Sequence, residues 1–203
     1  MKTIIFKVII IFTIGFILME CSRRTAEPPL ILDKVEINDY IGELREYSGQ
    51  VLSSIADFRE NSIQGVQIIP KETYRLKIYG MVLTPVEMTY DQVLDHNKYA
   101  KVVILNCVEG WTVKILWQGI LVGDLIKHAV AKEGAAVAIF HAVDGYKISI
   151  PLEDIYNNHL LLAYKMNGLN LPPERGFPFQ LVAESKWGSS WIKWVTGIEL
   201  SDY

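Results

Sequence analysis

Short apolar and alternating segments, separated by turns such as Asp144-Gly145 and Asn167-Gly168, fill the chain between residues 73 and 200. Period-two alternation predicts half-buried strands, and a short β-branched run predicts a buried one. We expect strands at 73–79, 101–106, 111–117, 135–143, 146–150, 180–183 and 191–200, helices at 89–95 and 122–130, and a helix or a strand at 159–166. Gly80 and Gly119 are expected to end two of these strands. Strands mixed irregularly with short helices predict an α+β domain rather than a regular βαβ series.

Composition narrows the class of protein further. The chain has 203 residues, of which 50% are hydrophobic, and this suits one globular domain and excludes disorder for most of the chain. A formal net charge of -3 argues against a nucleic-acid partner, because nucleic-acid-binding domains usually carry a basic excess. Two cysteines are too few for a disulfide-built scaffold.

The first twenty residues differ from the rest of the chain. Lys2 and Lys7 precede an apolar run, 8–19, which predicts a signal peptide or an N-terminal anchor over residues 1–20. Leu18-Met19-Glu20-Cys21 is similar to the signal for lipid attachment, with Met19 and Glu20 in place of small residues. We therefore expect an extracytoplasmic protein, in the periplasm or on the outer face of the membrane, with lipidated Cys21, a plain signal peptide and an uncleaved anchor all left open. Residues 21–54 are expected to form a tether and lead-in, and residues 55–203 the domain.

Cys107 is the single cysteine of the expected domain and lies at the end of the strand expected at 101–106. Gly110 follows closely and would let a cofactor approach the backbone. A buried structural cysteine is the favoured interpretation from the residues alone. The alternatives are a thiolate ligand for a soft or high-valent metal, or a nucleophile activated by a histidine.

Other polar and aromatic residues give weaker signals. His96, His128, His141 and His159 lack metal-ligand spacing, and we expect them on the surface or satisfied in the core. Glu153 and Asp154 are expected at a helix start, where carboxylates interact well with the helix dipole. The three tryptophans Trp187, Trp191 and Trp194 are expected in the core, with a stacking surface for a planar ligand as the alternative. No P-loop, dinucleotide fingerprint or Gly-x-Ser-x-Gly elbow is present.

Several short motifs follow one another in a fixed order along residues 55–200. They are Phe58-Arg59-Glu60-Asn61, Cys107-Val108-Glu109-Gly110-Trp111, Trp117-Gln118-Gly119, Asp144-Gly145-Tyr146, Leu162-Ala163-Tyr164, Asn167-Gly168, Leu171-Pro172, Arg175-Gly176-Phe177-Pro178, Trp187-Gly188 and Ile192-Lys193-Trp194. In this order they resemble the sulfite oxidase superfamily of molybdopterin-binding oxidoreductases. The chain is more similar to its single-domain bacterial members, which include periplasmic methionine-sulfoxide reductases, than to its larger ones.

The resemblance implies a sulfite oxidase-type molybdopterin-binding fold and a molybdenum cofactor. The implied activity is oxygen-atom transfer coupled to two-electron redox chemistry, with the cofactor supplying the reactive centre and the protein its orientation. By analogy, Cys107 is the molybdenum ligand, Asn61, Gly110, Arg175 and Lys193 contact the cofactor, and Arg59 and Tyr146 line the substrate pocket. The implied partners are a small-molecule or oxidised-side-chain substrate and an external electron donor or acceptor, such as a membrane cytochrome. A monomer is expected.

Some residues depart from the family pattern. Gln180 stands where the family has an arginine, and Ser190 where many members have a lysine. No Arg-Arg pair precedes Val8, although molybdenum proteins of the family usually cross membranes by the twin-arginine route. These departures favour a second hypothesis, in which a membrane-anchored module without cofactor uses the same fold to bind a small ligand or a protein.

Overall fold

The computed structural model describes residues 42–203. The expected leader (1–20), Cys21 and most of the expected lead-in lie outside the described residues. Within residues 42–203, no helix is long and apolar enough to span a membrane.

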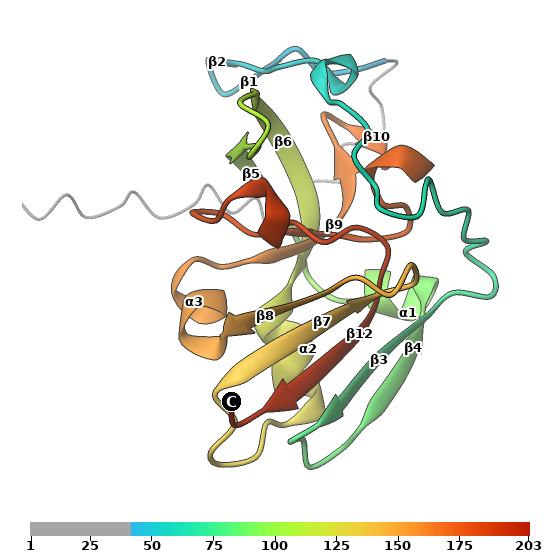
Figure 1. Cartoon of the computed structure of the whole chain (residues 1–203), viewed down its shortest axis with the longest axis vertical. Coiled ribbons are helices and arrows are strands. Elements are labelled where there is room, and N and C mark those ends of the chain that lie inside the picture. Colours follow the sequence, from blue (N-terminus) through green and yellow to red (C-terminus); the bar gives the residue numbers. More distant parts are fainter. Residues whose placement is uncertain (1–41) are drawn as a thin grey trace, which may run out of the picture.

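Two five-stranded sheets form the body of the described chain (Figure 1). The first has the order β10-β9-β6-β5, with β11 also paired to β9, and the second has the order β4-β3-β12-β7-β8. Only the β12–β3 pair is parallel among the described pairs. The first sheet comprises β5 (Lys98–Asn106), β6 (Thr112–Leu121), β9 (Leu161–Met166), β10 (Leu169–Asn170) and β11 (Gln180–Val182). The second comprises β3 (Arg75–Gly80), β4 (Val86–Thr89), β7 (Val137–Ala142), β8 (Lys147–Pro151) and β12 (Val195–Ser201).

Short helices and a small hairpin complete the described elements. They are β1 (Glu46–Tyr47), β2 (Gln50–Val51), α1 (Tyr90–Leu94), α2 (Val122–Ala129), α3 (Leu152–Asn157) and the 3-10 turns η1 (Ile55–Asp57), η2 (Pro173–Arg175) and η3 (Gly188–Ser190). Thr89 caps α1 as expected, since its hydroxyl accepts from the Gln92 amide while the Gln92 side chain returns to the Thr89 amide. The α+β class predicted from the sequence is confirmed.

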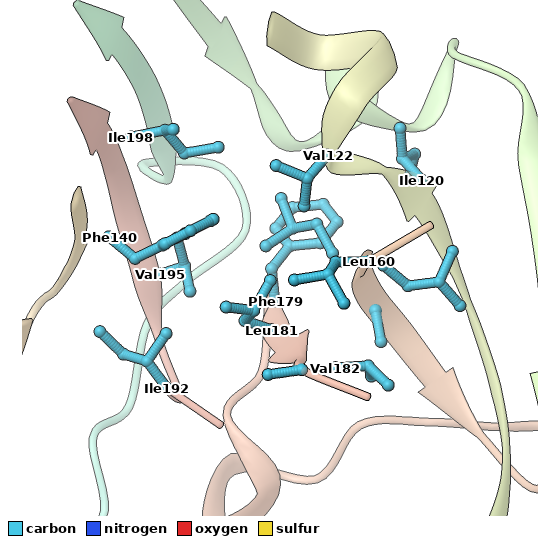
Figure 2. Close-up of a cluster of buried hydrophobic side chains, with 14 of the residues drawn as sticks. Ile120, Val122, Phe140, Leu160, Phe179, Leu181, Val182, Ile192, Val195 and Ile198 are labelled. Carbon is cyan, nitrogen blue, oxygen red and sulfur yellow. The ribbon is translucent and has the colours of Figure 1, made fainter. Parts of the chain in front are cut away.

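The main core draws buried side chains from both sheets and from α2. Figure 2 shows the ring of Phe179 among aliphatic side chains from separate parts of the chain, including Val122, Leu160 and Val195. Phe179 is fully buried, and its ring lies 5.3 Å from the rings of both Tyr74 and Tyr90. The core therefore joins the two sheets and holds the segment that enters β11.

Strand β6 continues beyond the glycine that was expected to end it. The strand passes through Gly119 to Leu121, and its register with β9 shifts between Gln118 and Gly119. A Cβ at Gly119 would lie 2.5 Å from the Leu162 carbonyl oxygen. The prediction of a strand end was wrong, because the glycine at this position allows β9 to approach closely and does not form a turn.

Two other strands differ from their expected form. Strand β5 pairs only with β6 among the described strands, so it is a sheet edge with Ile104 exposed and not the fully buried strand expected at 101–106. Strand β12 begins at Val195 rather than at 191. Trp194 has a left-handed φ of 53°, and a strand cannot continue through that conformation. The open assignment at 159–166 resolves to strand β9.

The described end of the lead-in is bonded to the first sheet. The Glu43 carboxylate accepts from the side-chain amide of Asn167 at 2.9 Å, and Leu52 is buried against Ala100 and Leu116. The Ser53 carbonyl accepts a second bond from the same Asn167 amide. Residues 43–53 thus pack on the domain, and the proposed domain start at residue 55 stays a prediction.

Asn167→Ala should lower the free energy of unfolding by about 2 to 3 kcal/mol, because buried polar groups would lose their partners. The Asn167 side chain is fully buried, and its oxygen also accepts from the Leu116 amide at 3.0 Å. Urea unfolding measures the change. The matched control is Asn157→Ala at an exposed helix end, which should change stability by less than about 0.5 kcal/mol. Equal losses in both variants would contradict this role.

Candidate active site

A cleft of about 260 Å³ opens beside the end of β5, and a smaller hollow of about 30 Å³ adjoins it. Asn61, Cys107, Gly188, Trp191 and Lys193 line both spaces. These residues come from the 58–63 segment, the β5–β6 turn and the stretch before β12. The fold thus brings three distant parts of the sequence to one place.

Cys107 supplies the thiol group of this site. Its side chain is 4% exposed and in contact with the core, and it lines both the cleft and the hollow. The turn after β5 fixes it: the Cys107 amide donates to the Trp111 carbonyl at 2.9 Å, and the Gly110 amide donates to the Cys107 carbonyl at 3.1 Å. The cysteine is buried, as the structural interpretation expected, yet its thiol borders the one site where several predicted residues meet.

Glycines allow the backbone to pack tightly around this thiol. A Cβ at Gly188 would lie 3.3 Å from the Cys107 Cα, so η3 lies directly against the β5–β6 turn. Gly110 has a left-handed φ of 83°, which closes the turn, but it does not line either space. Its predicted contact with a cofactor therefore stays a prediction, whereas Gly188 is a site residue that sequence reasoning did not select.

Tyr146 forms another wall of the cleft. It follows the Asp144-Gly145 turn between β7 and β8, and its amide donates to the Asp144 carboxylate at 3.0 Å. Its hydroxyl donates to the Ser189 carbonyl at 2.9 Å, which ties the β7–β8 turn to η3. Asp144 and Ser189 also line the cleft. The predicted Tyr146 is thus brought to the same cleft as Cys107.

Arg175 and Lys193 converge on a single carboxylate, that of Glu60. Arg175 Nη2 lies 3.1 Å from Glu60 Oε2, and Lys193 Nζ lies 3.0 Å from Glu60 Oε1. Arg175 also donates to the Arg59 carbonyl, and its guanidinium lies 4.9 Å from the Phe58 ring centroid. Lys193 also donates to the Glu174 carbonyl at 3.2 Å. The two predicted cations therefore form one cluster at the site.

Burial and neighbouring charges have opposing effects on the pKa of each group in this cluster, and all three pKa values are lowered. Burial lowers the pKa of Arg175 and of Lys193 below their ordinary values, although the nearby Glu60 carboxylate partly offsets this. Burial raises the pKa of Glu60, but hydrogen bonds from Ser62 and Lys193 outweigh it, so the pKa of this carboxyl lies below its ordinary value. Glu60 is thus held in its charged form between two cations.

Arg59 and Gln180 differ in how they relate to the site. The Arg59 side chain is exposed and lines neither space, so its predicted substrate role rests on the resemblance. Gln180 lines the small hollow, and its Oε1 is buried without a hydrogen-bond partner among the described residues. Leaving a buried oxygen without a hydrogen bond is costly, so this oxygen could accept a hydrogen bond from a ligand group that enters the hollow.

The remaining candidates separate clearly. Trp191 and Trp194 are buried as expected and also line the cleft, whereas Trp187 is 64% exposed. None of the four histidines lines either space; His141 contacts Glu199, and His96 packs edge-on against His128. Glu153 and Asp154 lie in the first turn of α3 as expected, and Asp154 also pairs with Lys186 at 2.5 Å. Among residues 42–203 no group of three or more metal-ligating side chains occurs.

Sequence reasoning missed several residues of the site. Besides Gly188 they are Glu60, Ser62, Ile63, Val108, Glu109, Asp144, Ser189 and Ile192. Most of them are immediate neighbours of predicted residues or belong to the same motifs. Adjacency in the sequence to a predicted site residue could therefore have identified most of them. The pairing of Glu60 with Arg175 and Lys193 could not be seen in the sequence.

Comparison with known families matches residues 63–203 to the family described as "Oxidoreductase molybdopterin binding domain". The chain belongs to this family. The match covers more than half of the chain and includes Cys107, Tyr146, Arg175 and Lys193. The family relationship predicted from the motif order is confirmed, and so is the oxidoreductase class at the level of the family.

Individual relatives of this molybdopterin-binding domain have diverse names. It is 33% identical over 129 residues to the uncharacterized oxidoreductase YuiH of Bacillus subtilis, covering 63% of this chain and 65% of YuiH. It is 29% identical over 148 residues to the protein-methionine-sulfoxide reductase catalytic subunit MsrP of Gluconobacter oxydans. This match covers 64% of this chain and 47% of MsrP. A Fusarium oxysporum NADPH nitrate reductase is 36% identical over 93 residues, 42% of this chain and 10% of the reductase.

A solved structure supports the fold. The sulfane dehydrogenase SoxCD of Paracoccus pantotrophus superposes with a TM-score of 0.70 at 22% identity, over 83% of this chain and 46% of that one. This likeness confirms the predicted fold. The molybdopterin-binding domain spans less than two thirds of the length of each of these four relatives.

The described residues fit the two ends of a molybdopterin cofactor. Cys107 offers a soft sulfur ligand for a metal, and the buried Arg175 and the mostly buried Lys193 offer cations for a phosphate. The unpaired Gln180 oxygen offers an acceptor in the same hollow. The cleft, at about 260 Å³, is slightly smaller than the roughly 300–1,000 Å³ usual for ligand sites.

Proposed function

We propose that the chain is a molybdenum-dependent oxidoreductase that transfers an oxygen atom, with Cys107 as the protein ligand of the metal. The observation that carries the proposal is the position of this thiol. Cys107 is the only cysteine of the described residues, and it shares the cleft with the predicted Asn61, Tyr146 and Lys193 and the adjoining hollow with Arg175. When bound, the cofactor would supply oxygen-atom transfer coupled to a two-electron change at the metal.

The cofactor-binding residues have separate roles in this proposal. Arg175 and Lys193 would bind the phosphate of the pterin, because a buried dianion needs cationic partners. Asn61 would contact the cofactor from the 58–63 segment, which lines both spaces. Gly110 would act through the turn that orients Cys107, since its amide donates to the Cys107 carbonyl.

The substrate side of the cleft is assigned to Tyr146, and Arg59 is assigned to the substrate by resemblance to the family. Tyr146 is positioned by Asp144 and Ser189, so its ring is held at the cleft wall. Trp191 and Ile192 are buried beside the same cleft and would exclude water from the reacting atoms. A small molecule or an oxidised side chain such as a sulfoxide fits this opening, by analogy with the methionine-sulfoxide reductase relative.

The two electrons require an external partner. We propose an electron donor or acceptor at the membrane, such as a cytochrome, and a monomeric chain with its domain at residues 55–203. An extracytoplasmic location rests on the apolar run at 8–19, and lipid attachment rests on Cys21.

A binding module without cofactor is the second candidate function. It is favoured by Glu60, which already neutralises Arg175 and Lys193, and by Gln180 in place of the family arginine. In that case the cleft would take a small uncharged ligand or a protein segment, and no metal would be retained.

Metal analysis separates the two candidates. The full chain, purified from a host that makes molybdopterin, should contain molybdenum and pterin in near-equal amounts close to one per chain. The same chain from a host without molybdopterin synthesis is the control and should contain neither. A chain without molybdenum from the first host would overturn the enzyme proposal and leave the binding module.

A further inference from the structure

Glu60 lies between two cations that are far more buried than it is. The Arg175 and Lys193 side chains are 8% and 12% exposed, whereas the Glu60 side chain is 34% exposed. Burying a cation without a nearby anion is costly, so an anion beside this pair stabilises it. The two cations are therefore largely enclosed by the fold, whereas the carboxylate that pairs with them is on the more exposed 59–72 segment.

The segment that carries Glu60 is irregular and mostly exposed, although Ile69 near its end packs against the core. Residues 59–72 contain no helix or strand, and most of them are exposed. Phe58 anchors the start of the segment through ring contacts with Trp111 and Trp117. Beyond Phe58, the contacts that fasten it to the cations are the Arg59 carbonyl and the Glu60 carboxylate.

The same segment narrows the site. Asn61, Ser62 and Ile63 follow Glu60 directly and line the cleft. Glu60 is bonded to Lys193, and the residues that follow it form part of the wall of the cleft, whose volume is below the usual range for a ligand site. Releasing the carboxylate would free both the cations and the residues that restrict the opening.

We infer that Glu60 is a resident anion that occupies the phosphate subsite of the cofactor-free chain and leaves when a phosphate binds Arg175 and Lys193. The Glu60 oxygens lie 3.0 and 3.3 Å from Lys193 Nζ, and one of them lies 3.1 Å from Arg175 Nη2. Phosphate oxygens are acceptors of the same kind, and both anions cannot use these donors at once. The inference rests on the proposed function, since it takes the entering anion to be the cofactor's phosphate.

Inorganic phosphate tests the exchange directly on the cofactor-free chain. Because Glu60→Gln removes the competing charge but keeps the side-chain size, it should bind phosphate about tenfold or more tightly than the wild type by titration calorimetry. Glu60→Ala should give a similar gain. The matched control is Glu109→Gln, a carboxylate that lines the same cleft but pairs with Trp111 rather than with the cations, and its phosphate affinity should change less than about threefold.

The outcomes separate this inference from the proposed function. Unchanged phosphate affinity in both Glu60 variants, or an equal gain in Glu109→Gln, overturns the exchange even if the wild type carries molybdenum. A gain confined to the Glu60 variants supports the exchange, and it does so whether or not molybdenum is found. Molybdenum content therefore tests the proposed function, and phosphate affinity tests the role of Glu60.

Discussion

Cys107→Ser should lower the molybdenum content of the purified chain from near one per chain to below about one-tenth, and oxygen-atom transfer by about 1,000-fold or more. Serine keeps the size of the side chain but replaces a soft thiolate with a hydroxyl that rarely ionises. The cysteine is 4% exposed, and its turn is held by backbone bonds to Gly110 and Trp111, so the substitution should leave the fold intact. Metal analysis and turnover of one preparation measure both effects.

Cys21→Ser is the matched control for this variant, because it removes the other cysteine of the chain. Its molybdenum content should equal that of the wild type. If Cys107→Ser kept its molybdenum, the metal would be held without this thiol and the assignment of the ligand would be wrong. Circular dichroism of both variants checks that a loss of metal does not reflect unfolding.

Phe179→Ala should lower the free energy of unfolding by about 3 to 5 kcal/mol, the usual cost of removing a buried aromatic ring and leaving a cavity. Phe179 is fully buried, contacts the rings of Tyr74 and Tyr90, and lies among side chains from both sheets (Figure 2). Its backbone carbonyl also accepts from the Val195 amide at 3.1 Å, where β12 begins. Urea unfolding followed by tryptophan fluorescence measures the loss.

Leu83→Ala is the control for that substitution, since Leu83 is exposed and should change stability by less than about 0.5 kcal/mol. A loss below about 1 kcal/mol in Phe179→Ala would mean that the core relaxes around the missing ring.

Local pattern predicted most of the elements that form the site. Alternation and β-branched runs located β3, β7 and β8, and Thr89 located the start of α1. These features depend on a few neighbouring residues, so they can be read along the chain. The position of Cys107 at the end of β5 followed in the same way.

Local sequence pattern could not predict which distant residues pair with one another. The sequence pattern predicts a strand end at Gly119, although this glycine lets β9 approach to a distance that no Cβ would allow. The β-branched run of β5 predicts a buried strand, but its sequence does not reveal whether neighbouring strands lie on both sides. Both errors concern which strands become neighbours, and sequence periodicity does not encode that choice.

The sequence by itself determined the α+β class, the family through the order of its motifs, and the thiol on which the proposed chemistry depends. Only the tertiary structure brought Cys107, Tyr146 and Lys193 to one cleft, placed Arg175 at the adjoining hollow, and placed Glu60 between the two cations. Glu60 is separated from Arg175 by 115 residues and from Lys193 by 133. Such contacts depend on how the two sheets pack, because side chains so far apart in the chain meet only after the core has formed.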